Sequence, residues 1–246
     1  MDRLLYIASV GARHIDRAQQ LAANNLANVS TTGFRADLAR AESRWVEGEG
    51  HPARVYGISQ TEHIDMSVGV KQHTGRALDV AVASEGLIAL QKDDGSEVYT
   101  RNGQLRVDGN GRLLGEGDMP VLGDGGPISL PPFTSVQIGK DGTISIRPEG
   151  QAPNTLVEVD RIKLVNPAAA DVVKDSSGSL VRADGQPEGR AAGVELEAGH
   201  LESSNVNAVH ELTSILSLAR QFELEVRMMQ TAKTNDEAST RLLQIS

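Results

Sequence analysis

Both ends of the chain carry a stripe of small and apolar residues that recur at alternating spacings of three and four. This spacing places the members on one face of a helix and is typical of helices that pair with each other. The sequence therefore predicts a long helix over residues 1–30 and another over residues 205–245, pairing as a coiled-coil-like core. The first stripe consists of Leu4, Ala8, Gly11, Ile15, Ala18, Ala22, Asn25 and Val29, and the second of Leu212, Ile215, Ala219, Phe222, Val226 and Met229.

The first stripe contains more alanine and glycine than large apolar side chains. Small residues let two helix backbones approach closely, but they bury little apolar surface. Isolated helices depend on tertiary packing for most of their stability. We therefore expect both ends to be only marginally stable in a lone chain.

Three asparagines, Asn24, Asn25 and Asn28, stand near the end of the first predicted helix. Asn25 lies on the stripe itself, where a polar side chain costs stability and fixes the register of pairing. The other two lie on flanking faces, where an amide can both donate and accept hydrogen bonds. The alternative interpretation is that all three are ordinary residues close to a helix cap. We expect Gly33 to take a left-handed conformation and redirect the chain.

The middle of the chain differs from both ends. Short apolar runs are separated by Asn-Gly and Asp-Gly dipeptides, which are typical of strands joined by tight turns. We expect a hairpin over residues 104–114 and a β-bulge between Val159 and Ile162. The predicted fold class is α+β, with long terminal helices and a central β-rich domain. The expected regions are an N-terminal helix (1–30), an extended connecting arm with some strand (31–74), a β-rich domain (75–195) and a C-terminal helix with its lead-in (196–246).

Composition excludes several functions. The net charge of -9 argues against a nucleic-acid binder, which needs clustered Lys and Arg. The absence of cysteine excludes disulfides, thiolate catalysis and cysteine zinc sites. The low aromatic content of 3% argues against a large ligand pocket, so no cofactor or small-molecule substrate is expected. No apolar run approaches the roughly 20 residues that span a bilayer, and the first residues lack the pattern of a cleaved signal peptide.

The titratable residues do not form a recognisable catalytic or metal site. Only His63, Asp65 and His73 come near a ligand set, and solvated or interface histidine is the better interpretation. A second hypothesis is a β-domain module that binds or hydrolyses cell-wall polymer. It needs convergent acids, and the available ones are Glu85, Glu97 and Asp118.

Four stretches, in order along the chain, resemble the flagellar basal-body rod and hook family. They are NNLANVSTTGF (24–34), TGRALDVAVASEGLIAL (74–90), YTRNGQLRVDGNGRLL (99–114) and HLESSNVNAVHELTSILSLARQFELEVRMMQTA (200–232). Within the family, the start MDRLLYIA and the segment VDRIKLVNP resemble proximal-rod members, with distal-rod and hook-type axial proteins as the near alternative. The family often has an aromatic where this chain has Leu87 and Ile88, so we expect an altered pocket at one subunit contact.

The resemblance implies a structural, non-enzymatic subunit of the proximal rod. Such proteins are exported through the flagellar type III apparatus without a cleaved signal, and they assemble into a hollow helical drive shaft across the periplasm. The implied partners are copies of the chain, other proximal rod subunits, the distal rod protein, the rod cap, the surrounding rings and the export apparatus. The implied assembly interface comprises both stripes together with Asn24, Asn28, Asn205 and Asn207.

From residue chemistry alone, we also expect Ser204 or Asn205 to cap the second helix.

Overall fold

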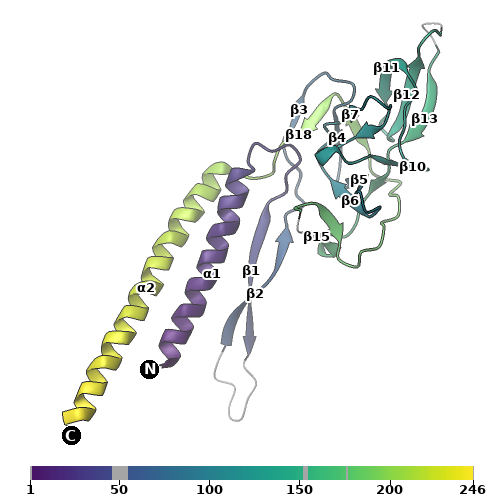
Figure 1. Ribbon diagram of the computed structural model, residues 1–246. Helices are drawn as coiled ribbons and strands as arrows, with labels where there is room; N and C mark the ends of the chain where they lie inside the picture. Colours follow the sequence, from purple (N-terminus) through teal and green to yellow (C-terminus); the bar gives the residue numbers. More distant parts are fainter. Residues whose placement is uncertain (1, 46–54, 152–154, 176, 246) are drawn as a thin grey trace. The chain divides into compact units, whose positions relative to one another are not determined.

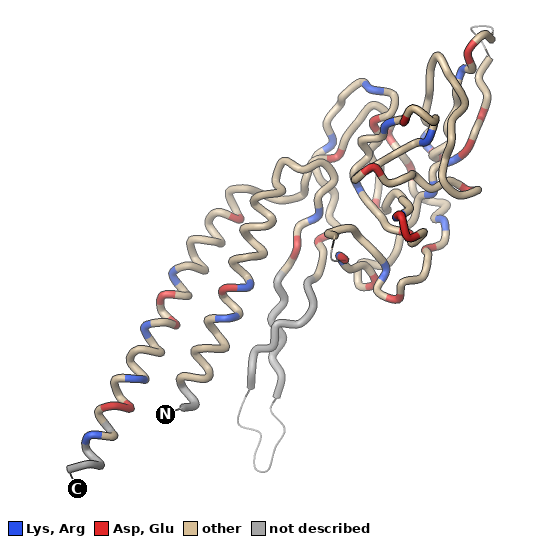
Figure 2. Tube along the Cα trace, in the orientation of Figure 1, with Lys and Arg blue, Asp and Glu red and all other residues tan. Residues whose placement is uncertain are grey.

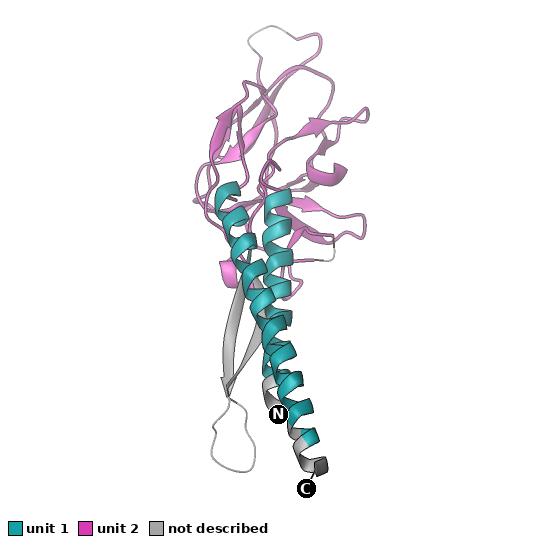
Figure 3. Cartoon of the chain, turned by 90° about the vertical axis from the view of Figure 1, so that its left-hand side faces the viewer, with its two compact units in different colours: residues 1–27, 37–63, 207–246 teal, residues 28–36, 64–206 magenta. Residues whose placement is uncertain are grey.

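The computed structural model describes residues 2–45, 55–151, 155–175 and 177–245, with side chains described for 5–38, 63–151, 155–175, 177–238 and 240–241. The chain forms two compact units, which Figure 3 distinguishes by colour. We call residues 1–27, 37–63 and 207–246 the helical unit, and residues 28–36 and 64–206 the β unit.

The helical unit contains the helices α1 (Asp2–Ala27) and α2 (Ala208–Ile245), with a two-stranded sheet of β1 (Asp37–Trp45) and β2 (Val55–Ile64). The helices lie side by side in Figures 1 and 3. They run antiparallel, because Asn25 contacts Glu211 whereas Gly11 lies against Glu225. These contacts are 14 residues apart on each helix, a separation of two heptads.

The α+β fold class, with a helix at each end and a β-rich centre, is confirmed. Pairing of the helices as a true coiled coil remains a prediction. The first helix ends at Ala27, three residues before the predicted limit, because the chain turns at Asn28: the Thr31 N–H donates to the Asn28 carbonyl at 3.1 Å. Of the described helices, neither combines the length and apolarity needed to cross a membrane.

The β unit is built from short antiparallel strands. Its largest sheet has the order β14-β5-β6-β16-β15, a second has the order β11-β12-β13, and the others are pairs. The strands are β3 (Lys71–His73), β4 (Val80–Val82), β5 (Leu87–Gln91), β6 (Glu97–Thr100), β7 (Arg106–Val107), β8 (Leu113–Leu114), β9 (Leu122–Gly123), β10 (Gly126–Pro127), β11 (Phe133–Ile138), β12 (Thr143–Pro148), β13 (Val157–Arg161), β14 (Leu164–Val165), β15 (Val172–Lys174), β16 (Leu180–Arg182), β17 (Leu196–Ala198) and β18 (His200–Glu202).

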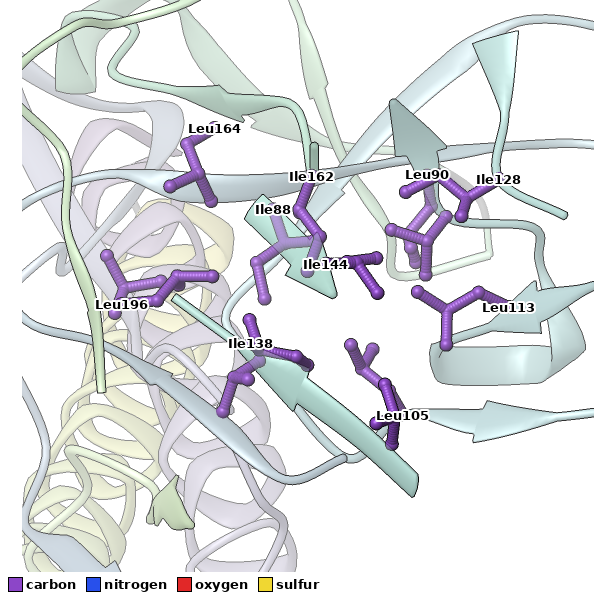
Figure 4. Packing of buried hydrophobic residues seen from close by; sticks show 14 of the residues in the cluster. Ile88, Leu90, Leu105, Leu113, Ile128, Ile138, Ile144, Ile162, Leu164 and Leu196 are labelled. Carbon is purple, nitrogen blue, oxygen red and sulfur yellow. The ribbon is translucent and has the colours of Figure 1, made fainter. Parts of the chain in front are cut away.

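Alternating side chains of these strands form the apolar core. On β12, Ile144 and Ile146 are fully buried while the residue between them is partly exposed. In Figure 4, Ile144 lies at the centre of the cluster, close to Ile88 and Ile162. A smaller cluster gathers around Leu87 and Tyr99. Aliphatic side chains therefore supply most of this core.

Two local predictions are confirmed. Strands β7 and β8 form the expected hairpin, with Arg106 opposite Leu114. The register between β12 and β13 shifts at Val159, at the start of the stretch where a bulge was expected.

The expectation for Leu87 and Ile88 is wrong. Both side chains are fully buried in the β unit, one in each apolar cluster, so they do not line an exposed pocket. Aliphatic residues at these positions therefore contribute to the core.

Ile144→Ala should destabilise the β unit by about 2–5 kcal/mol, because it leaves a cavity among fully buried side chains. Denaturant unfolding of the full chain measures the effect. Ser145→Ala, on the partly exposed face of the same strand, is the control and should change stability by less than about 0.5 kcal/mol. Equal effects of the two substitutions would contradict this description of the core.

Candidate assembly surfaces

Large apolar side chains remain exposed along both helices. The most exposed on α2 include Val209 at 71%, Leu216 at 61% and Leu224 at 58%. Soluble chains rarely leave contiguous apolar surface uncovered unless it binds another molecule. The exposed set is Leu5, Tyr6 and Ile7 on α1 and Val209, Leu212, Leu216, Phe222, Leu224 and Met228 on α2.

The stripe predicted on α1 largely faces inward. Ala8, Ala22 and Asn25 are buried, whereas Gly11, Ile15 and Ala18 are half-buried. The pattern missed Ala12, which is also buried and lies one helical turn from Ala8. The side chain of Leu4 lies outside the described residues, Asn24 is exposed, and Asn28 and Val29 follow the helix in the β unit.

The stripe predicted on α2 is divided between two surfaces. Ile215, Ala219, Val226 and Met229 are half-buried, whereas Leu212 and Phe222 are exposed. The exposed members cannot be covered by α1 alone, because a helix can contact only one face of its neighbour. Figure 2 shows acidic and basic residues interspersed along α2.

A groove of about 580 Å³ lies on the helical unit. Ile15 of α1 lines it together with Leu224 and Met228 of α2. Glu225 also lines the groove, and its carboxylate packs over Gly11, with Oε1 only 3.0 Å from where a β-carbon at Gly11 would stand. The other oxygen of Glu225 is buried without a hydrogen-bond partner among the described residues. The remaining lining residues are Gln221, Arg227 and Thr231.

Asn25 uses its amide within its own chain. Its Oδ1 accepts from the Asp37 N–H at 2.9 Å, and its Nδ2 donates to the Asp37 carbonyl at 2.9 Å. Nδ2 also lies 3.5 Å from Glu211 Oε1 on α2. The side chain therefore joins α1, the start of β1 and the first turn of α2.

The predicted N-cap is wrong by two or three residues. Asn207 caps α2, because its Oδ1 accepts from the N–H groups of Val209 and His210, both at 3.1 Å. The helix cannot begin earlier, since Asn205 is bound within the β unit through contacts to Ala36 and Asp65.

A cluster of buried charges joins three distant segments of the β unit. Glu202 accepts from Arg35 Nη2 at 2.5 Å and from Arg101 Nη1 at 3.0 Å. All three side chains are almost completely buried. Burial lowers the pKa of Arg101, and the Glu202 carboxylate opposes that shift. Local sequence pattern could not reveal this cluster, because its three members come from segments far apart along the chain.

Gly33 occupies the left-handed conformation that was expected, with φ of +71°. A β-carbon there would stand 2.3 Å from the Asn102 nitrogen, so a larger residue would require the backbone at Asn102 to shift. The Gly33 N–H also donates to the Glu202 carbonyl at 2.8 Å. This glycine therefore brings the segment after α1 against the chain beside Arg101.

Two of the three acids considered for catalysis, Glu97 and Asp118, form ion pairs with basic side chains. Glu97 pairs with Lys163 at 2.7 Å, and Asp118 pairs with Arg106. His73 lies against His200, with ring centroids 4.8 Å apart. Among the described residues, no group of three or more His, Cys, Asp or Glu side chains has metal-binding geometry.

Three family models match successive parts of the chain: flagella basal body rod protein over residues 5–35, the flagellar hook protein FlgE/F/G D1 domain over 81–146, and the flagellar basal body rod FlgEFG protein C-terminal region over 197–242. Each segment contributes one member of the buried charge cluster, namely Arg35, Arg101 and Glu202.

Similar curated proteins span the full chain. It is 36% identical over 253 residues to the flagellar basal-body rod protein FlgF of Escherichia coli (strain K12), covering 100% of both chains. It is 30% identical to FlgF of Caulobacter vibrioides, again over 100% of both. Similarity to FlgG of Buchnera aphidicola subsp. Schizaphis graminum is 26%, over 98% of both.

The chain therefore belongs to the flagellar basal-body rod protein family. It is a structural subunit of the rod in the flagellar basal body.

Gly33→Ala should destabilise the β unit more than Gly185→Ala. The two glycines have similar φ values, +71° and +68°, but no atom lies within 4 Å of a β-carbon at Gly185. Gly185→Ala should cost about 1–2 kcal/mol from backbone strain alone. Gly33→Ala should cost about 1–3 kcal/mol more because the backbone at Asn102 must move. Thermal unfolding of the two variants compares them, and equal losses would refute the close approach.

Proposed function

We propose that the chain polymerises through the exposed apolar faces of α1 and α2, which pack against the same helices of neighbouring copies in the rod. The supporting observation is the row of large apolar side chains on the helical unit, which includes Leu216 and Leu224. Burying one such side chain contributes about 1.5–3 kcal/mol. Several of them together can offset the loss of translational and rotational freedom on association.

The pairing register supports a coiled-coil-like core. The contacts of Gly11 and Asn25 are separated by two heptads on both helices, so the same faces can repeat along the pair. Small residues on the α1 stripe allow a close approach of the two backbones. The groove beside Ile15 offers space for a side chain from another copy.

The expected position of the subunit is the proximal rod, and the near alternative is another axial position of the same family. In this proposal the subunit leaves the cell by the flagellar export apparatus and crosses the periplasm as part of a hollow shaft that transmits torque. Its partners are further copies and other rod subunits, then the distal rod, the rod cap and the surrounding rings. The two stripes and the asparagines Asn24, Asn28, Asn205 and Asn207 are its proposed contacts. The role is mechanical, and no catalytic step belongs to it.

Leu216→Glu combined with Leu224→Glu should abolish rod assembly without unfolding the lone chain. Both side chains are more than half exposed, so charge is tolerated in the monomer, whereas a closed apolar interface excludes it. Motility in soft agar and recovery of the chain in purified basal bodies measure assembly, and circular dichroism measures folding.

The matched control is Gln104→Glu combined with Gln186→Glu, which adds the same charge at exposed polar positions of the β unit, outside α2. It should leave motility close to that of the wild type. Normal amounts of the Leu216/Leu224 variant in basal bodies would refute the proposed interface.

A further inference from the structure

The backbone passes between the two units four times, at residues 27/28, 36/37, 63/64 and 206/207. On the side of the β unit, these passages belong to three segments, residues 28–36, 64–70 and 202–206. Any force that passes between the units through the covalent chain must pass through these segments. The contacts among these segments therefore affect how force is carried between the units, in addition to their contribution to stability.

Glu202 belongs to the third of these segments and binds the other two. Its carboxylate accepts from Arg35 Nη2 at 2.5 Å and from the Gly69 N–H at 2.6 Å. Its backbone carbonyl accepts from the Gly33 N–H at 2.8 Å. Arg101, the residue that follows strand β6, donates from Nη1 to the same carboxylate at 3.0 Å. Glu202 therefore connects the segments to the largest sheet as well.

Asn205 repeats this arrangement three residues later. Its Oδ1 accepts from the Ala36 N–H at 2.9 Å, and its Nδ2 donates to the carbonyls of Asp65 at 2.9 Å and Ser67 at 3.2 Å. The segments also bind one another directly, because the Asp65 N–H donates to the Ala36 carbonyl at 2.9 Å. One acidic and one amide side chain thus connect the three segments of the β unit to which all four passages belong.

Removing the carboxylate of this cluster leaves other buried groups without a charged partner. Glu202 is fully buried between two buried guanidinium groups, so its removal leaves two cations without an anion. Arg101 already has two nitrogens without a hydrogen-bond partner among the described residues. Charge-assisted bonds of this kind have narrow geometry, whereas apolar contacts allow sliding.

We propose that Glu202, Asn205, Arg35 and Arg101 form a polar junction within the β unit, which holds together the segments through which the covalent chain carries force from the helical unit in the assembled rod. The proposal rests on the proposed function, since only an assembled subunit carries torque. It assigns to Glu202 and Asn205 a positioning role in transmission, beyond the stability of the lone chain.

Glu202→Gln is the direct test, and Glu197→Gln is its matched control. Glu197 lies on neighbouring strand β17 and makes a partly exposed pair with Lys71 at 2.9 Å. In the purified full chain, Glu202→Gln should speed amide exchange at Gly33, Asp65 and Gly69 by about tenfold or more, while the amides of β5 and β12 keep their protection. The control should leave all of these amides unchanged.

The decisive measurement is motility of cells carrying each variant as medium viscosity rises. We expect the Glu202→Gln variant to be recovered in basal bodies at wild-type amounts but to lose swimming at a viscosity that cells with the control tolerate. Swimming equal to the control at every viscosity, with exchange at the junction accelerated, would overturn the proposal. If this variant is instead missing from basal bodies because its β core unfolds, Arg35→Met is the deciding variant, because it breaks the contact between residues 28–36 and Glu202 and leaves Glu202 paired with Arg101.

The two proposals fail in different ways. If the helices do not form the assembly interface, charge at Leu216 and Leu224 leaves rods intact. If only the junction proposal is wrong, charge at Leu216 and Leu224 abolishes rods, whereas Glu202→Gln and Arg35→Met rods assemble and turn normally under load.

Discussion

Two helices packed side by side can cover only one face of each other, and this constraint governs the helical unit. Ala8, Ala22 and Asn25 fill the covered face of α1, whereas Leu216 and Leu224 on α2 stay in contact with water. Such a unit leaves apolar surface in water as a monomer, and we propose that helices of neighbouring copies cover it. In this proposal, the apolar surface that is unfavourable in solution favours polymerisation of the rod subunit.

The β unit, by contrast, buries its apolar side chains within a single chain. Its aliphatic core, centred on Ile144, is closed within one chain and needs no neighbour. The buried charges of Arg35, Arg101 and Glu202 then fasten the segments adjoining the helices to that core. The proposed assembly surface and the closed apolar core thus belong to separate units, so apolar surface on the helices can stay exposed without unfolding the β unit.

Local pattern was sufficient for the helices, the hairpin of β7 and β8, and the conformation of Gly33, because each depends on residues near one another in sequence. Local pattern did not predict features that depend on contacts between residues far apart in the sequence. Asn205 has the chemistry of an N-cap, but its amide is bound to Ala36 and Asp65, so Asn207 caps α2. The charge cluster was missed for the same reason: nothing within any one segment shows that Arg35, Arg101 and Glu202 meet.

The absence of cysteine from the chain permits a direct test of the central claim, that the exposed face of α2 is buried only by assembly. Leu216→Cys introduces a single thiol at a position that is 61% exposed in the lone chain. Its rate of reaction with a maleimide should be that of an open thiol in the purified monomer and should fall by about tenfold or more in isolated basal bodies. Equal rates in monomer and rod would contradict the account.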